Sequence, residues 1–410
     1  MTRTLVAKFF IVFCALAFTA SKSYANDCTA VVNNDSTAAQ APDNGVPVEH
    51  IFDSGARWNM CIHIDAQTGL TISQLHYGAP NEPSRKVLES AAVAQILFKY
   101  DEDTSAQHWL SDFGLGGANH LTADQSLCPT GNIVSVGPSS SICSNLKDLN
   151  NLTSLRRSVS LRRRGLSLHA WSAIGGYRIE QEWQFTEDGN ITPTVRLGGV
   201  LNRFTRNAKY GSDIGLPDAL AANATLLFTW KLDFNINNTP NNDVVEEIEF
   251  VPFITNVVRR TISVKELQTE SLHKVDRRRF RGWLVTDKDV SAGPDRDTRI
   301  GYFLDPQSSG FSYISRAENW SVFDLALTKN EPCEHLASGN HKHNPSCGDD
   351  LDEYTNGESL VNADPVLWFS LARQFIAKRE DFPAILTRNA SFTLIPFDWS
   401  ASTPFSELPE

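Results

Sequence analysis

The chain has 410 residues, of which 41% are hydrophobic and 10% aromatic, and its formal net charge is −11 at pH 7. This length and composition allow a large packed core, and the negative charge disfavours nucleic acid as a partner. After the first apolar run, at residues 9–20, no segment is apolar enough to span a membrane.

The first 25 residues have the features of a secretory signal peptide. Arg3 and Lys8 form a short basic region, the apolar run follows, and Ser23-Tyr24-Ala25 provides small residues for cleavage. We therefore expect a cleaved signal peptide and a secreted or periplasmic protein. The next segment, residues 26–50, is rich in Asn, Asp, Ala and Pro and predicts a flexible N-terminal tail.

From about Phe52 onward the pattern is typical of β-strands. Apolar and polar residues alternate over 58–65 and, after a turn, continue as a second strand over 70–77, which predicts a β-hairpin. The same alternation returns over 177–185, before an Asp-Gly turn, and over 226–233. Many strands and few helical segments predict a large all-β sandwich in a single domain.

Cysteine and histidine residues suggest further features. One of the seven cysteines, Cys14, lies in the expected signal peptide. The even number that follows favours disulfides in an exported protein, although spacing alone does not fix their pairing. Two of them flank a histidine-rich segment whose members could bind zinc or copper, or could surround a disulfide: Cys333, His335, His341, His343 and Cys347.

Residues 221–233 carry the resemblance to a known family. The segment ends in Phe-Thr-Trp-Lys-Leu-Asp, and it resembles the copper-ligand strand of the copper amine oxidases, roughly N-H-Q-H-F-F-N-F-R-L-D. Further similar blocks extend from Trp58 to Phe405, among them Asp-Phe-Gly-Leu-Gly at 112–116 and Asp-Pro-Val-Leu-Trp at 364–368. The resemblance implies an amine-oxidase β-sandwich (a supersandwich) and a catalytic domain over 51–410. It also implies a strand over the Ala-rich residues 87–100, which propensity alone would allow as a helix.

Family chemistry requires three copper-binding histidines, a tyrosine that becomes topaquinone, and an aspartate base. By the resemblance, Tyr177 falls at the quinone position and Tyr100 at that of a tyrosine that hydrogen-bonds the quinone. Because Tyr177 lies on the apolar face of its strand, an unmodified core tyrosine is expected there. The positions of the three copper ligands and of the base are occupied by residues without a suitable donor: Ala224, Leu226, Phe375 and Trp109.

The resemblance also bears on a second metal and on the cysteines. A peripheral calcium-type site of the family falls on Asp233, Asn235 and Asp364, whose oxygens suit Ca²⁺; alternatively the two aspartates only cap strand ends. The family carries a disulfide at Cys128–Cys143. We take Cys28–Cys61 and Cys333–Cys347 as the other two pairs.

The family further implies a homodimer formed through this domain. Three arginine clusters, at residues 156–157, 162–164 and 277–279, are then expected in β-arms or interfaces and not in a nucleic-acid site. We predict a secreted family member without copper–quinone oxidase activity, a pseudoenzyme that binds a small apolar or amine ligand or performs non-redox chemistry in the old pocket. The alternative is a divergent primary amine oxidase, dependent on copper and quinone, that recruits other ligands.

Overall fold

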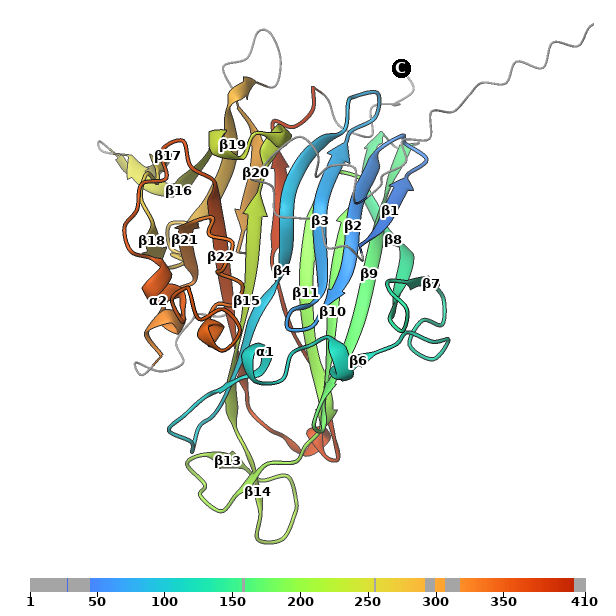
Figure 1. The fold of residues 1–410 in the computed structure, drawn as a ribbon, viewed down its shortest axis with the longest axis vertical. Helices are drawn as coiled ribbons and strands as arrows, with labels where there is room; N and C mark the ends of the chain where they lie inside the picture. The colour runs from blue at the N-terminus through green and yellow to red at the C-terminus, as the bar shows by residue number, and fades with distance from the viewer. Residues whose placement is uncertain are drawn as a thin grey trace, which may run out of the picture.

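The computed structural model describes residue 28 and residues 45–156, 159–253, 256–291, 299–306 and 318–401. The expected signal peptide and residues 26–44, apart from Cys28, lie outside this range. Two large antiparallel sheets face each other and enclose the main core (Figure 1), which confirms the predicted all-β sandwich. No helix in the described part of the chain is long and apolar enough to cross a membrane.

The nine-stranded sheet has the order β1-β2-β3-β4-β15-β22-β21-β18, and β5 pairs with β4. Its strands are β1 (Val46–Ile51), β2 (Arg57–Asp65), β3 (Gly69–Gly78), β4 (Arg85–Tyr100), β5 (Gln107–His108), β15 (Ala224–Phe234), β18 (Ser271–His273), β21 (Leu325–Lys329) and β22 (Pro365–Phe375). Strand β1 places ordered structure at residues 46–50, within the segment that the sequence assigned to the tail.

The twelve-stranded sheet has the order β17-β16-β19-β20-β24-β11-β10-β9-β8-β7, with β23 paired to β11 and β6 to β9. Its strands are β6 (His120–Leu121), β7 (Asn132–Ser135), β8 (Ser141–Arg156), β9 (Val159–Ile174), β10 (Tyr177–Thr186), β11 (Ile191–Val200), β16 (Asp243–Phe253), β17 (Asn256–Glu266), β19 (Gly282–Ser291), β20 (Arg299–Asp305), β23 (Ala384–Ser391) and β24 (Thr393–Phe397).

The remaining elements are short. A three-stranded sheet consists of β12 (Phe204–Thr205), β14 (Leu220–Ala222) and β13 (Gly211–Ser212). Within the described ranges the two α-helices are α1 (Trp109–Asp112) and α2 (Leu351–Tyr354). The 3₁₀ helices are η2 (Gly117–Asn119), η3 (Ile236–Asn238), η4 (Pro240–Asn242), η5 (Asn319–Val322), η6 (Asn340–Lys342) and η7 (Arg379–Asp381).

Strand β4 shows how tertiary burial decides a segment whose composition allows a helix. It pairs with β3 on one side and β15 on the other, and it is buried on both faces. Ile96 and Phe98 face the main core, whereas Ala94 and Leu97 belong to a second cluster. Small alanine side chains suit a central strand that is packed on both faces, so the strand expected from the resemblance is observed.

Polar contacts as well as packing join the two large sheets. The indole Nε1 of Trp58, on β2, donates to the carbonyl oxygen of Thr186, on β10, at 2.9 Å. Gln181 of β10 accepts a bond from the backbone N–H of Leu70 at 3.0 Å and donates to the carbonyl of Thr68 at 2.8 Å. Because these groups are buried, their bonds help to fix the register of one sheet on the other.

The second hydrophobic cluster lies on the outer face of the nine-stranded sheet. The segment between β21 and β22 covers this face: Ala337 N–H donates to the carbonyl of Ala94 at 3.1 Å, and Leu351 N–H donates to that of Ala337 at 3.2 Å. Within this cluster the ring centroids of Trp368 and Tyr354 lie 5.8 Å apart. The cysteine- and histidine-rich segment singled out in the sequence is therefore part of a packed layer.

Candidate functional site

Tyr177 begins β10 and points into the space between the two sheets. A turn at Gly175 and Gly176 precedes it, and Gly175 has a φ of +57°, a conformation that glycine adopts without steric cost. Alternation along β10 then directs Ile179 and Trp183 inward with it, as the sequence predicted. The side chain of Tyr177 is buried in the main core, with 9% of the residue exposed.

Tyr100 ends β4 in the opposite sheet, and the hydroxyls of Tyr100 and Tyr177 are hydrogen-bonded to each other. The Tyr177 hydroxyl also donates to Oδ1 of Asn202 at 3.3 Å. Burial raises the pKa of both phenols. Both tyrosines are thus neutral near pH 7, and the pair forms a polar bridge between the sheets inside an otherwise apolar core.

Strand register brings together four of the positions that the resemblance linked to copper and quinone. Ala224 lies opposite Tyr100 across the β15–β4 pair and opposite Phe375 across the β15–β22 pair. Leu226, two residues along β15, is on the same face as Ala224, because side chains alternate along a strand. Ala224, Leu226 and Phe375 are all buried in the main core.

Trp109 completes this cluster from the start of α1. Its ring stacks on Phe98 with centroids 5.0 Å apart and planes 8° apart, and its centroid lies 5.2 Å from that of Tyr177. The helix is held in place because Gln95 Oε1 accepts the N–H of Leu110 at 3.0 Å. His108, the preceding residue, instead places Nε2 3.3 Å from a carboxylate oxygen of Glu318.

The donor chemistry at these positions does not fit copper. Copper in proteins takes imidazole nitrogen, thiolate or carboxylate ligands. Alanine, leucine and phenylalanine side chains offer no lone pair, and the indole nitrogen of Trp109 is a donor that bonds to Gln107 Oε1 at 3.3 Å. The side chains at the positions that the resemblance assigns to the ligands and the base are buried in the main core, and Trp109 packs beside Tyr177.

Three residues beside the tyrosine pair were missed by the sequence analysis. Phe98 could have been found, because it lies two residues before Tyr100 on one face of β4. Asn202 and Arg203 follow β11, and no local pattern marks them. The guanidinium carbon of Arg203 lies 5.2 Å from the centroid of the Tyr100 ring, and Arg203 pairs with Asp103 at 3.0 Å.

The oxygen cluster at the opposite end of β15 has the chemistry of a calcium site. Asn330 Nδ2 donates to Oδ2 of Asp364 at 2.8 Å and to Oδ2 of Asp233 at 3.3 Å, so it holds the two aspartates near each other. Asn235 donates its amide to a carboxylate oxygen of Glu89 at 2.9 Å. One buried oxygen on each of Asp233, Asn235 and Asp364, the Oδ1 atom, has no hydrogen-bond partner.

The charges of this cluster are incompletely compensated. Burial, with a contribution from Asp364, raises the pKa of Asp233 well above its usual value. Burial likewise raises the pKa of Asp364, to about 6. Lys231 donates to the carbonyl of Glu334 at 2.6 Å, and burial lowers its pKa. An oxygen-binding divalent cation would satisfy the unpartnered oxygens, so these residues fit the candidate calcium site.

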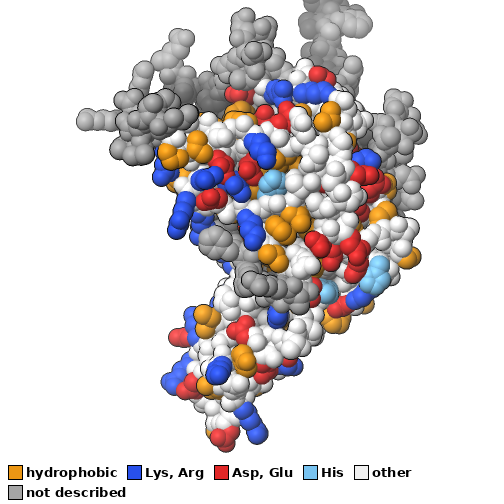
Figure 2. Space-filling model, turned by 90° about the vertical axis from the view of Figure 1, so that its left-hand side faces the viewer, with side chains coloured by type: hydrophobic (Ala, Val, Ile, Leu, Met, Phe, Trp, Pro, Cys, Tyr) orange, Lys and Arg blue, Asp and Glu red, His pale blue; other side chains and the backbone are white. Residues whose placement is uncertain are grey.

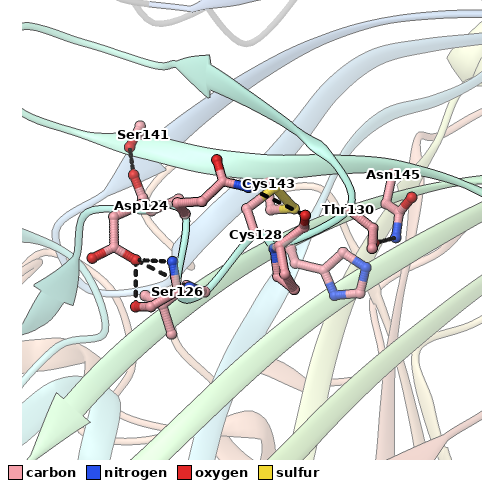
Figure 3. Close-up of a disulfide and its surroundings, with 12 residues drawn as sticks. Asp124, Ser126, Cys128, Thr130, Ser141, Cys143 and Asn145 are labelled. Atoms are coloured by element: carbon pink, nitrogen blue, oxygen red, sulfur yellow. Dashed lines mark hydrogen bonds between the residues drawn. A yellow bond between two sulfur atoms is a disulfide. The ribbon is translucent and has the colours of Figure 1, made fainter.

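Three disulfides join the cysteine pairs expected above: Cys28–Cys61, Cys128–Cys143 and Cys333–Cys347. Figure 3 shows the second, between β8 and the loop that precedes β7. In that loop Asp124 Oδ1 accepts bonds from Ser126 N–H at 2.8 Å and from Leu127 N–H at 3.0 Å. Cys28 is buried, so its disulfide anchors one point of the expected tail to β2.

The histidine-rich segment does not converge on a metal site. Its cysteines are bonded to each other, and His343 Nε2 lies 3.0 Å from the carbonyl oxygen of Ser111. His341 instead contacts the carboxylate of Asp349. In the described ranges, a histidine and two glutamates that could hold a metal ion lie together elsewhere and were not singled out from the sequence: His169, Glu180 and Glu182.

The arginine clusters are partly described, since Arg157 and the side chains of Arg156 and Arg162 lie outside the described residues. Arg163 pairs with Asp188 at 3.0 Å, and Arg279 with Glu249 at 3.1 Å. On the face that carries β16 and β17, basic side chains lie among acidic ones (Figure 2). The absence of a nucleic-acid site at the three clusters stays a prediction.

Comparison with known proteins places these features in a family. Residues 147–410 match the family model described as "Copper amine oxidase, enzyme domain". The chain is 23% identical over 402 residues to a histamine oxidase of Arthrobacter globiformis, covering 87% of this chain and 57% of that protein. It is 21% identical to a primary amine oxidase of Lens culinaris, covering 90% of this chain and 62% of that protein.

Solved structures show the same fold. A copper-containing benzylamine oxidase of Hansenula polymorpha superposes with a TM-score of 0.73 at 17% identity, covering 89% of this chain and 63% of that chain. A lysyl oxidase of Pichia pastoris gives a TM-score of 0.72 at 17% identity, covering 86% and 52%. The chain thus spans less than two thirds of the length of these relatives. With a family model that matches most of its residues, the chain belongs to the copper amine oxidase family.

Proposed function

We propose that this chain is a member of the family that lacks the copper–topaquinone centre and binds a small apolar or amine ligand at the old site. The observation that carries the proposal is the apolar core that contains Tyr177. The positions assigned to the copper ligands and the base are occupied by Ala224, Leu226, Phe375 and Trp109 and are filled with apolar side chains.

The side chains that remain can position a ligand but have little capacity for acid–base chemistry. Both phenols are neutral near pH 7, because burial raises their pKa values. The hydroxyl pair offers hydrogen bonds, and Arg203 and Asn202 supply polar groups at its edge. Phe98 and Trp109 stack on each other, so an apolar or cationic ligand would displace part of this packing and contact the ring that it exposes. This combination supports binding, or a non-redox reaction, over oxidation.

Metal analysis and mass spectrometry test the loss of the oxidase centre. Purified protein incubated with copper and then desalted should carry no stoichiometric copper that depends on residues near Tyr177. The peptide that contains Tyr177 should have the mass of unmodified tyrosine, and a quinone stain should be negative. Stoichiometric copper with a topaquinone mass at Tyr177 would instead establish the alternative, a divergent amine oxidase with other ligands.

Ligand binding is tested separately by fluorescence. Trp109 lies beside Tyr177, so a small aromatic amine such as benzylamine should alter tryptophan emission in a saturable way. Replacement of Arg203 by Ala, which removes the cation over Tyr100, should change the affinity for an anionic analogue and for an amine in opposite directions. If wild type and Arg203→Ala have the same affinity for the amine and the same affinity for the anionic analogue, the binding site lies elsewhere.

We also propose that Asp233, Asn235 and Asp364 hold a calcium ion, which would stabilise the end of β15 against the start of β22. Their unpartnered oxygens support this, and the ion would neutralise buried carboxylates.

Export and dimerisation belong to the same proposal. The disulfides are consistent with an oxidising compartment, and light scattering of the purified protein tests for a homodimer.

A further inference from the structure

The outer face of the twelve-stranded sheet carries a cluster that the proposed function does not use. Inward-facing Ile179 and Trp183 alternate along β10 with Glu180 and Glu182, so the two glutamates lie on the outer face. His169 of β9 is directly opposite Glu182 in the strand register. The cluster is therefore separated from Tyr177 by the sheet itself.

Distances within the cluster suit an imidazole prepared to bind a metal. Nδ1 of His169 lies 2.8 Å from Oε1 of Glu180, which assigns its N–H to that hydrogen bond. Nε2 then carries the lone pair and lies 3.7 Å from Oε1 of Glu182. One potential ligand atom from each of the three residues lies within 4.8 Å of the others.

We propose that His169 Nε2 and Glu182 Oε1 bind a divalent transition-metal ion of the Zn²⁺ type, and that Glu180 orients the imidazole through Nδ1. Two cis ligands of one ion have a separation close to that of these atoms, and a carboxylate on the second imidazole nitrogen is the usual support of a metal-binding histidine. The side chains of His169 and Glu182 are 9% and 4% exposed, so water would complete the coordination from the side that Lys147 vacates.

Two basic side chains form ion pairs with these carboxylates and would compete with a metal ion for them. Lys147 Nζ lies 2.6 Å from Oε1 of Glu182, and Arg196 bonds to Oε1 of Glu180 at 3.0 Å and to Glu182. The Lys147 side chain is 32% exposed, so it can turn into solvent when an ion takes its place. Arg196 stays as the partner of the other carboxylate oxygens.

Both oxygens of Glu182 already face cations, because Lys147 pairs with Oε1 and Arg196 with Oε2. An ion that binds Oε1 therefore replaces one cation by another, and its main cost is displacement of the Lys147 ammonium.

Calorimetric titration with Zn²⁺ tests the site. The disulfide-bonded protein is freed of metal with EDTA, and millimolar Ca²⁺ is added to saturate the oxygen cluster at Asp233. One zinc equivalent should bind to the wild type. Lys147→Met should tighten binding by about tenfold, because the competing cation is gone. His169→Gln should abolish it, and Glu180→Gln should weaken it by about 10–100-fold through loss of orientation.

The histidine-rich segment provides the matched control. A variant with His341→Gln and His343→Gln removes two other imidazoles and should keep the same zinc affinity as the wild type. Circular dichroism checks that each variant is folded. The expected increase in zinc affinity of Lys147→Met cannot result from unfolding, because unfolding would weaken binding. Equal zinc affinity in His169→Gln, loss only in the His341 and His343 variant, or no binding to wild type and Lys147→Met would each overturn the proposal.

Discussion

Phe375 lies at a position that the resemblance assigns to a metal ligand, and it is part of the core. It lies opposite Ala224 in the sheet, and 3% of its surface is exposed. The guanidinium carbon of Arg388 lies 5.5 Å from the centroid of its ring. A side chain in this position contributes through packing, and its removal leaves a cavity that the surrounding strands can fill only in part.

We therefore expect Phe375→Ala to lower the free energy of unfolding by about 3–5 kcal/mol. Denaturant titration measures the change. Ile376→Ala is the matched control, because the neighbouring side chain is 61% exposed and its loss should change stability by about 0.5 kcal/mol or less. Equal effects of the two substitutions would contradict the packing of Phe375 in the core.

Asn235 illustrates how one substitution depends on its surroundings. Its amide nitrogen donates to Glu89, which also pairs with buried Lys86 at 2.8 Å, so the carbonyl oxygen is left for an ion. An aspartate here would place a carboxylate beside that of Glu89. The neutral amide avoids this repulsion, although it gives calcium one negative charge fewer.

At the scale of elements, calcium should clamp the end of β15 to the start of β22. Thermal melting of the wild type should occur at a higher temperature in millimolar Ca²⁺ than in EDTA, because the ion binds only the native arrangement. The two curves should coincide for Asp364→Ala. Asp213→Ala removes an exposed carboxylate, 65% exposed in its side chain, and should keep the calcium response.

The response to calcium should also depend on pH. The pKa of Asp364 is raised to about 6, above its ordinary 3.8, so the folded chain binds more protons in that interval. Without calcium, its contribution to stability therefore falls as the pH rises from 3.8 to about 6. Calcium needs the ionised form, so the calcium-induced shift in melting temperature should be full above about pH 7 and shrink as the pH falls through about 6. A shift that is equal at pH 5 and pH 7.5 would contradict this assignment.

The disulfide between β8 and the preceding loop is a second feature that stabilises individual elements. Its cysteines are separated by 15 residues, and closing such a loop stabilises the chain by about 3 kcal/mol in the chain-entropy description. The double variant Cys128→Ser, Cys143→Ser should lose about this amount in denaturant titrations. Peptide mapping without reduction checks the bond itself, and a free thiol at either position would refute the pairing.

At the scale of the whole molecule, periodicity and resemblance together predicted the architecture. Alternation identified the hairpin of β2 and β3 and the strands β10 and β15. For β4, the alanine-rich composition was ambiguous, and burial on both faces made it a strand. The start of β1 at Val46 was missed, because its pairing with β2 is a tertiary contact.

For the candidate sites as well, features marked by a local sequence pattern could be proposed, and features set by tertiary contacts could not. Positions tied to a motif, such as Tyr177 and Asp364, could be proposed from the sequence and their roles stay predictions, whereas partners from distant segments could not be proposed at all. Arg203 contacts Tyr100 although 103 positions separate them in the sequence and no shared motif links them. His169 lies beside Glu182 because β9 and β10 pair in this register. Clusters of this kind depend on which strands become neighbours, and local spacing contains no information on that.

The arrangement of the whole sandwich around Tyr177 leads to the last prediction. Strand register already places positions 224 and 375 side by side, with 226 on the same face, and Tyr100 bonds to Tyr177. By the resemblance, these are the positions of the copper ligands, and we therefore predict that the strand arrangement can carry donors that the present side chains lack. Histidines at these positions would be buried, so without copper they should lower the melting temperature, and copper should restore it.

We expect the triple variant with Ala224→His, Leu226→His and Phe375→His to bind copper but not to oxidise amines, because Trp109 leaves no base. Adding Trp109→Asp should allow a copper-dependent increase in the mass of the peptide that contains Tyr177. The same peptide from the wild type, treated with copper, should keep the mass of tyrosine. If the quadruple variant folds, binds copper and still leaves Tyr177 unmodified, the cluster has lost more than its donors, and the space that Phe98 and Trp109 fill beside the phenol is the next element to open.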